Sequence, residues 1–203
     1  DLNKALANVP PDRIAGVMDR LGIGYEVCAA INERHENTEY LHGIQLPPTI
    51  RATHDAEQAA AGASTVVLAV PSQTLRGNLT EWAPVLPREA ALVSLMKGVE
   101  LGTLDRMSEV IAEVTGADAD RIAVISGPNL SKEIARREPA ASVVACADEE
   151  TAKRLQRLCH APSFRPYTST DVVGCEPPTD ADGDSACGVR SLGDPGEAYR
   201  RGR

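Results

Sequence analysis

The strongest constraint on the fold is a regular alternation of short apolar runs with amphipathic segments. Residues 64–70, STVVLAV, and 90–96, AALVSLM, are apolar and rich in aliphatic side chains, and a polar turn follows each of them. Runs of this length and composition are typical of strands buried on both faces of a parallel sheet. Similar runs at 121–126 and 140–147 continue the pattern, and 163–169 closes it.

The segments between these runs have the spacing and the end signals of helices. Asp55 is a typical N-cap residue and Gly116 a typical C-terminal stop. The expected helices are 26–37, 55–63, 72–86, 103–116, 129–138 and 148–160, and a short strand is expected at 49–53. Strands and helices in alternation predict an α/β fold, a parallel sheet with helices on both faces.

Three parts of the chain differ in character. Residues 26–176 carry the alternating pattern and are predicted to form one α/β domain. Residues 1–25 stay unassigned because Pro10 and Pro11 interrupt any helix. Residues 177–203 are rich in Pro, Gly and Asp, with Val189 and Leu192 as their only large aliphatic side chains. Such a tail cannot offset its own ordering entropy, so it is predicted to be disordered.

Composition excludes several classes of function. A formal net charge of -8 and only 3% aromatic residues argue against nucleic-acid binding. No apolar run reaches the ~18 residues of a membrane span, and no signal peptide is visible. The five cysteines form no C-x-x-C pair, and the histidines are scattered. We expect a cytoplasmic protein without disulfides and without a metal site.

Polar residues follow three successive strands at the point where each strand ends. Ser72 and Thr74 follow the first, Lys97 the second, and Gly127 and Asn129 the third. The carboxyl ends of parallel strands meet at one edge of a sheet, where ligands bind. A lysine, a glycine that permits close approach and the N–H groups of a following helix suit a phosphorylated ligand or a dinucleotide. Taken singly, each feature is also explained as a turn, a solvated lysine or a helix entry.

These strand ends also carry a resemblance to a known family. The stretches NERHENTEYLHGIQLP, LAVPSQTLR, VSLMKGVE and VISGPNLSKEIA resemble bacterial NAD(P)-dependent glycerol-3-phosphate dehydrogenase, and PYTSTDVVGCE extends the match to about residues 26–176. The resemblance implies hydride transfer between NAD or NADP and dihydroxyacetone phosphate, giving sn-glycerol 3-phosphate for phospholipid synthesis. It also implies that residues 26–176 form a partial Rossmann-like dinucleotide-binding domain, an incomplete parallel sheet with helices on both faces and without the helical substrate domain. For the full-length members it implies a homodimer.

The resemblance implies roles for individual residues. Lys97 would contact both the cofactor and the substrate, while Gly127 and Asn129 would line the substrate site. Ser131, Thr74 and Ser72 would lie against the cofactor.

Two parts of the family pattern are missing. The family begins with a G-x-G-x-x-G/A turn, whereas here Gly22 and Gly24 are followed by Val27 at the sixth position, as in an ordinary turn before a helix. After Glu176 the family continues with Gly-Gly-Ala-x-Lys-Asn, which supplies its catalytic lysine and leads into a helical substrate domain. This chain reads PPTDADGDS instead, and no lysine follows Lys153. No catalytic residue is therefore assigned, and little or no activity is expected. Our hypothesis for 177–203 is an out-of-frame or unrelated sequence.

Two alternatives remain. The first is an α/β fragment that binds neither cofactor nor substrate. The second is a related dehydrogenase with another phosphorylated substrate, against which the YLHGIQLP and SGPN stretches argue.

Overall fold

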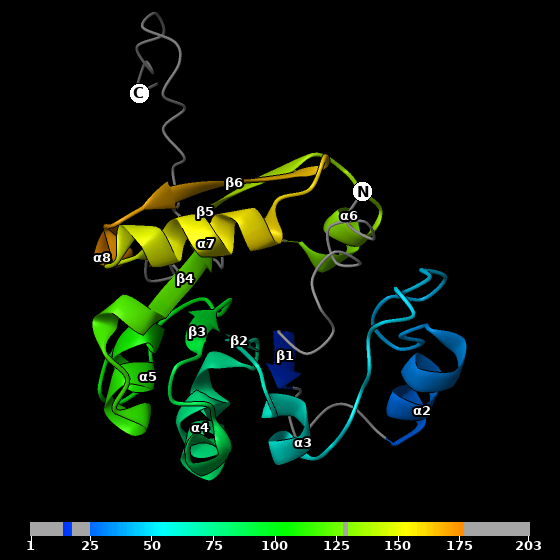
Figure 1. Ribbon diagram of the computed structural model, residues 1–203, viewed down its shortest axis with the longest axis horizontal. Coiled ribbons are helices and arrows are strands. Elements are labelled where there is room, and N and C mark those ends of the chain that lie inside the picture. The colour runs from blue at the N-terminus through cyan, green and yellow to red at the C-terminus, as the bar shows by residue number, and fades with distance from the viewer. Residues whose placement is uncertain (1–13, 18–24, 128–129, 177–203) are drawn as a thin grey trace, which may run out of the picture.

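The centre of the molecule is a twisted sheet, shown in Figure 1. The computed structural model describes residues 14–17, 25–127 and 130–176. In this described part the sheet has six strands in the order β1-β2-β3-β4-β5-β6. The strands are β1 (Ile14–Val17), β2 (Thr65–Leu68), β3 (Ala91–Ser94), β4 (Ile122–Ser126), β5 (Ala140–Cys146) and β6 (Phe164–Ser169).

The prediction of a parallel sheet is confirmed for four of the strand pairs and wrong for one. Strands β1 to β4 are parallel to one another, and β6 is parallel to β5. Strand β5 runs antiparallel to β4, with Ser126 opposite Val143. A parallel return needs a crossover of a dozen or more residues, usually including a helix packed on the sheet. The link of residues 127–139 is long enough for a crossover, but its described part holds no helix longer than the five-residue α6 (Ser131–Ala135), followed by a left-handed turn at Arg137 (φ 64°), and β5 lies antiparallel beside β4.

The expected helices are present, with the expected end signals. They are α2 (Tyr25–Arg34), α3 (Ala56–Ala60), α4 (Leu75–Trp82), α5 (Met107–Thr115), α6, α7 (Glu149–Cys159) and the short α8 (Val172–Cys175), with 3-10 turns η1 (Ser72–Thr74), η2 (Ala83–Val85) and η3 (Ala119–Arg121). The Asp55 carboxylate accepts from the amides of Glu57 and Gln58 at the start of α3. Gly116 ends α5 in the left-handed conformation, with φ 65°.

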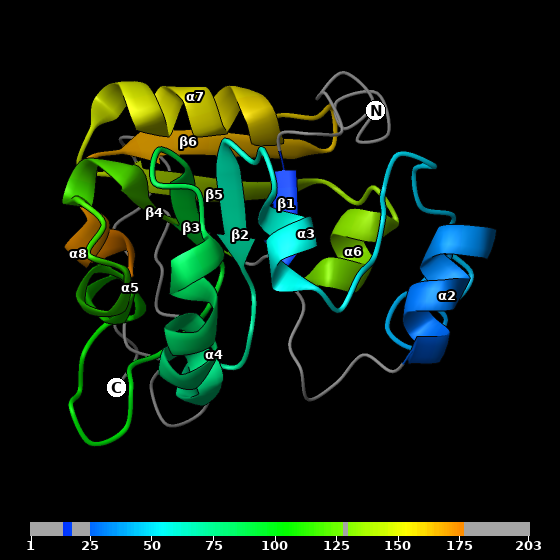
Figure 2. The same cartoon turned by 60° about the horizontal axis from the view of Figure 1, so that its bottom comes forward.

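The short strand expected at 49–53 is absent, so that prediction is wrong. The Ala52 amide donates to the side chain of Asn32 instead of to a neighbouring strand, and the Asn32 amide donates back to the Ala52 carbonyl. These two bonds fasten the 35–55 segment to α2. Both views show α2 standing apart from the sheet, beyond α3 and α6 (Figures 1 and 2).

Helices cover both faces of the sheet, as predicted. Alternate side chains of the strands point to opposite faces, so Leu92 packs under α4 and α5 while Val93 packs under α7. The first layer includes Leu79 and Ile111, and the second includes Leu155. Figure 2 shows β2 and β3 between these two helical layers.

Strand β1 falls in the segment that sequence left unassigned. It pairs with β2 in parallel, with Ile14 opposite Thr65. Across the described strands, order in the sheet follows order in the chain without a reversal. The predicted tail, 177–203, lies outside the described residues, as does the Gly22–Gly24 turn.

Membrane spans, metal sites and disulfides can be examined only in the residues that the structure describes. None of the helices described is long and apolar enough to cross a membrane. In the same residues no group of His, Cys, Asp and Glu side chains is arranged to hold a metal ion. Among the described cysteines, Cys28, Cys146 and Cys159 are free thiols.

Candidate functional site

The lysine at the end of β3 reaches across to the end of β4. Lys97 lies three residues after Ser94, the last residue of β3, and is half-buried. Its ammonium group donates to the Gly127 carbonyl at 3.2 Å and lies 3.5 Å from the Ser126 hydroxyl. The structure therefore brings Lys97 and Gly127 together at the carboxyl ends of two adjacent parallel strands, which is the edge where ligands bind.

Gly127 is required by the packing of the sheet. Its φ is 145°, a conformation that side-chain-bearing residues rarely adopt. A Cβ added there would lie 3.0 Å from the Ala141 carbonyl oxygen and 3.1 Å from the Ser142 Cα. The sequence suggested that a ligand approaches Gly127 closely. On this side of Gly127 the close neighbour is instead the backbone of β5.

The predicted cofactor-side residues at the end of β2 lie in η1. Ser72 and Thr74 are half-buried there, and the Thr74 hydroxyl donates to the Pro71 carbonyl at 2.9 Å. Ser131 is exposed at the first position of α6. Asn129 lies outside the described residues, so its predicted place in the substrate site stays a prediction.

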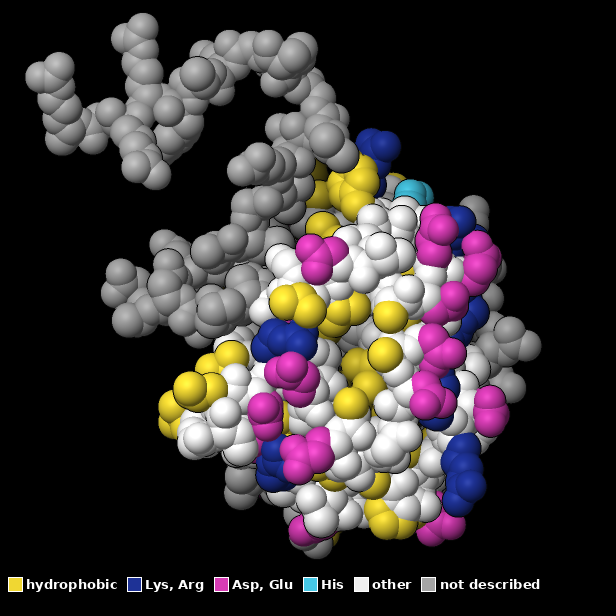
Figure 3. All heavy atoms as spheres, turned by 90° about the vertical axis from the view of Figure 1, so that its left-hand side faces the viewer, with side chains coloured by type: hydrophobic (Ala, Val, Ile, Leu, Met, Phe, Trp, Pro, Cys, Tyr) yellow, Lys and Arg dark blue, Asp and Glu magenta, His cyan; other side chains and the backbone are white. Residues whose placement is uncertain are grey.

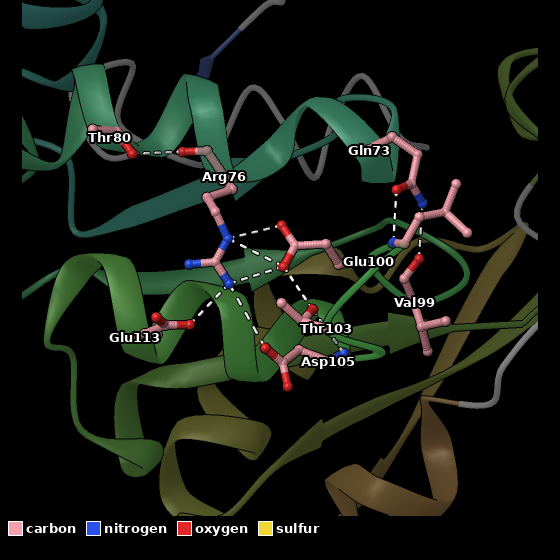
Figure 4. A network of polar contacts seen from close by, with 9 residues as sticks. Gln73, Arg76, Thr80, Val99, Glu100, Thr103, Asp105 and Glu113 are labelled. Atoms are coloured by element: carbon pink, nitrogen blue, oxygen red, sulfur yellow. Dashed lines mark hydrogen bonds and ion pairs between the residues drawn. The ribbon is translucent and has the colours of Figure 1, made fainter.

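Gln73, between Ser72 and Thr74, links the end of β2 to the loop that carries Lys97. Its side-chain amide donates to the Val99 carbonyl at 2.8 Å, and its side-chain oxygen accepts from the Leu101 amide at 2.9 Å (Figure 4). Sequence analysis missed this contact. The only signal was the position of the glutamine beside two candidate residues.

The same loop is held a second time by an ion-pair network around Arg76 of α4. The guanidinium contacts the Glu100 carboxylate through Nε at 2.8 Å and Nη2 at 2.9 Å. Nη2 also lies 2.8 Å from Glu113 of α5 and 3.7 Å from Asp105. The Thr103 hydroxyl donates to Glu100 at 2.7 Å. Hydrogen bonds from Arg76 hold the pKa of Glu100 below its usual range.

A buried carboxylate ties the last described residue to α5. Glu176 accepts from the Ser108 amide at 2.8 Å and from the Ser108 hydroxyl, and Arg106 Nη1 lies 3.5 Å away. The contact places a negative charge at the N-terminus of α5, where the helix dipole favours it. Burial nevertheless raises the pKa of Glu176, because the charged form loses hydration.

A protein-family model covers most of the chain. A model of the N-terminus of NAD-dependent glycerol-3-phosphate dehydrogenase matches residues 5–152. The match begins upstream of the stretch in which the resemblance was traced, and it includes β1 to β5.

Individual relatives give the same result. Glycerol-3-phosphate dehydrogenase [NAD(P)+] of Streptomyces griseus is 65% identical over 151 residues, which are 74% of this chain and 45% of that protein. The chain therefore spans about half the length of the curated relatives that it matches.

Two solved structures show the same fold. DsGPDH of Dunaliella salina has a TM-score of 0.72 and 30% identity, covering 80% of this chain and 28% of its own. Glycerol-3-phosphate dehydrogenase from Coxiella burnetii has a TM-score of 0.68 and 27% identity, covering 74% of this chain and 46% of its own.

Proposed function

Because the chain belongs to the NAD-dependent glycerol-3-phosphate dehydrogenase family, we propose that its strand ends carry the substrate side of a site for dihydroxyacetone phosphate and sn-glycerol 3-phosphate. The relatives are NAD(P)-dependent oxidoreductases by name. The observation that carries the proposal is the position of Lys97, whose ammonium group lies between the ends of β3 and β4.

Lys97 supplies the charge that this chemistry needs. The substrate phosphate is a dianion, and reduction of its ketone would develop negative charge on the carbonyl oxygen. A bound NAD(P)H would supply the hydride. A fixed ammonium group at either place stabilises the charge without reorganising water. The Ser126 hydroxyl and the Gly127 carbonyl hold the lysine in one orientation, so this charge is already positioned before a ligand arrives.

The described residues form only part of a dinucleotide-binding site. A Rossmann domain binds its dinucleotide at the point where strand order reverses, and the described strands β1 to β6 follow chain order throughout. Ser72, Thr74 and Ser131 remain proposed cofactor contacts, and we expect NAD(P)H to bind weakly.

Activity of the chain as printed is expected to be low for a second reason. The family's catalytic lysine is expected shortly after Glu176, and the sequence there reads PPTDADGDS, with no lysine beyond Lys153. A chain without that lysine lacks a proton donor and cation that the resemblance implies for the reaction.

Binding and turnover of the full chain test the proposal separately. Titration calorimetry with dihydroxyacetone phosphate is expected to show saturable binding that Lys97→Ala weakens at least about tenfold, the loss of one charge-assisted contact. Lys153→Ala is the matched control, since Lys153 pairs with Glu149 and Glu150 on the surface of α7. If the unaltered protein, Lys97→Ala and Lys153→Ala bind dihydroxyacetone phosphate with equal affinity, the proposed site is refuted.

The second measurement is oxidation of NADPH by dihydroxyacetone phosphate. We expect almost no turnover, and a rate close to that of a full-length relative would show the expectation of low activity to be wrong. The second candidate function, a fragment that binds neither ligand, is favoured by the unreversed strand order. It is established if neither NADPH nor dihydroxyacetone phosphate binds.

Cellular location and assembly belong to the proposal as well. A cytoplasmic location fits the free thiols of Cys28, Cys146 and Cys159. Dimerisation stays a prediction for this chain, and light scattering on the purified protein tests it.

A further inference from the structure

The loop after β3 is fastened at two points directly beyond Lys97. The Gln73 side chain forms hydrogen bonds with backbone groups of Val99 and Leu101. Arg76 forms an ion pair with the carboxylate of Glu100, which lies between them. Both holding residues belong to the segment that follows β2. The backbone that carries Lys97 is thus set by the neighbouring strand end, as Figure 4 shows for the two fastenings.

The two fastenings have different chemistry. A primary amide offers a donor and an acceptor side by side, so Gln73 pairs with a carbonyl and an N–H two residues apart, as a neighbouring strand would. The Arg76 contact is ionic and also engages Glu113 of α5. Loss of the Gln73 contacts leaves the ionic fastening in place, so the loop stays folded while its backbone beside Lys97 is released.

We propose that Gln73 is a positioning residue for Lys97: by pairing with Val99 and Leu101 it fixes the backbone that aims the lysine at Ser126 and Gly127. The amide is exposed, so its hydrogen bonds contribute modestly to global stability and chiefly determine where the loop lies. The value of that position for a phosphorylated ligand rests on the function proposed above. The positioning itself does not depend on any ligand.

Competitive acetylation of the full chain by acetic anhydride measures the position of the lysine directly. The rate at Lys97 is divided by the rate at Lys153, and peptide mass spectrometry resolves the two sites. An ammonium group that donates to fixed acceptors gives up its proton less readily than a free one. Release of the loop in Gln73→Glu and Gln73→Ala is therefore expected to raise the ratio at least about threefold, the effect of losing one or two hydrogen bonds.

The matched control is Gln156→Glu. Gln156 of α7 donates its side-chain amide to the Pro166 carbonyl at 2.9 Å, so the same substitution removes the same kind of bond far from the Lys97 loop. The ratio is expected to stay unchanged in this variant. An unchanged ratio in both Gln73 variants overturns the proposal, because Gln73 then does not position Lys97. An equal increase of the acetylation rates at Lys97, Lys132 and Lys153 also overturns it, because the whole fold has then loosened.

Protection by dihydroxyacetone phosphate separates this inference from the proposed function. If the ligand slows acetylation of Lys97 in the unaltered protein while the Gln73 variants leave the ratio unchanged, the substrate site is supported and the positioning role is refuted. If the Gln73 variants raise the ratio and the ligand gives no protection, the positioning role is supported and the substrate assignment is refuted.

Discussion

Arg76 and Glu100 form a two-point ion pair between α4 and the loop after β3, with Nε 2.8 Å from Oε1 and Nη2 2.9 Å from Oε2. Thr103 donates to the same carboxylate at 2.7 Å. The pair joins segments that follow two different strands and so fixes the distance between two strand ends. Paired geometry of this kind depends on the planar fork of arginine.

Replacement of Arg76 tests that dependence. Lysine keeps the charge but cannot make two parallel bonds, so Arg76→Lys is expected to lower the urea midpoint of unfolding, and Arg76→Ala to lower it further. Arg154→Lys is the control, since Arg154 Nη1 donates at 3.2 Å to the Thr65 hydroxyl and so makes no two-point pair with it. If Arg76→Lys unfolds at the same urea concentration as the unaltered protein, the fork geometry is unimportant.

Gly127→Ala is expected to destabilise the fold. The new methyl group must approach the Ala141 carbonyl at 3.0 Å with φ at 145°, which costs about 1–3 kcal/mol. Gly77→Ala is the matched control: Gly77 lies inside α4 with nothing within 4 Å of an added Cβ, so alanine there should stabilise by about 0.5–1 kcal/mol. Urea unfolding of both variants measures the difference, and equal effects would argue against a special role of the Gly127 backbone.

Leu79→Ala tests the packing of α4 on the sheet. Leu79 is fully buried in the layer that includes Leu92 and Ile111, and its truncation should cost about 2–5 kcal/mol. Leu101 is 76% exposed, so Leu101→Ala should change the free energy of unfolding by less than about 0.5 kcal/mol. Comparable losses in the two variants would mean that the α4 layer is not the main core.

Glu176 should make stability depend on pH. Burial raises its pKa above the ordinary 4.5, so the folded chain holds this proton more tightly than the unfolded chain. The resulting stabilisation is complete below the ordinary pKa and is lost as pH rises through the folded pKa. The free energy of unfolding is therefore expected to fall with rising pH relative to that of Glu176→Gln, measured by urea between pH 4 and pH 7.

Glu138→Gln serves as the comparison for this titration. Glu138 is exposed between α6 and β5, so Glu138→Gln makes the same chemical change at a surface position. A constant difference between the unaltered protein and Glu176→Gln across the pH range would contradict the expectation.

Cys159 should resist alkylation in the folded protein. Burial raises the pKa of its thiol from 9.0 to about 11, so about a hundredfold fewer molecules carry the reactive thiolate at pH 8. Iodoacetamide should modify this cysteine at least that much more slowly in the native chain than in urea, as followed by peptide mass spectrometry. Similar rates in the two states would show that the thiol is accessible and unperturbed.

Local signals in the sequence predicted most of the fold. Asp55 and Gly116 marked helix ends, and the apolar run 64–70 marked a buried strand, because each depends on neighbours close in the chain. The direction of β5 was missed, since the apolar run is the same whichever way the strand runs. The predicted strand at 49–53 failed because its backbone bonds a side chain of α2.

The candidate site was predicted in part. Lys97 and Gly127 were placed together correctly, because the rule that parallel strand ends converge needs no knowledge of side-chain contacts. The fastenings by Gln73 and Arg76 join residues more than 20 positions apart, and no spacing rule relates a glutamine after one strand to backbone groups after the next.

The strand order described above has a consequence for how the chain folds during synthesis. Each strand from β2 to β6 pairs with the strand made just before it, as Thr65 pairs with Ala91 and Ala140 with Phe164. A ribosome-bound chain can therefore complete each pairing as the next strand emerges, without waiting for distant sequence. Growth of the sheet then proceeds from one side only, and the newest strand is always the open edge that must be protected until its neighbour arrives.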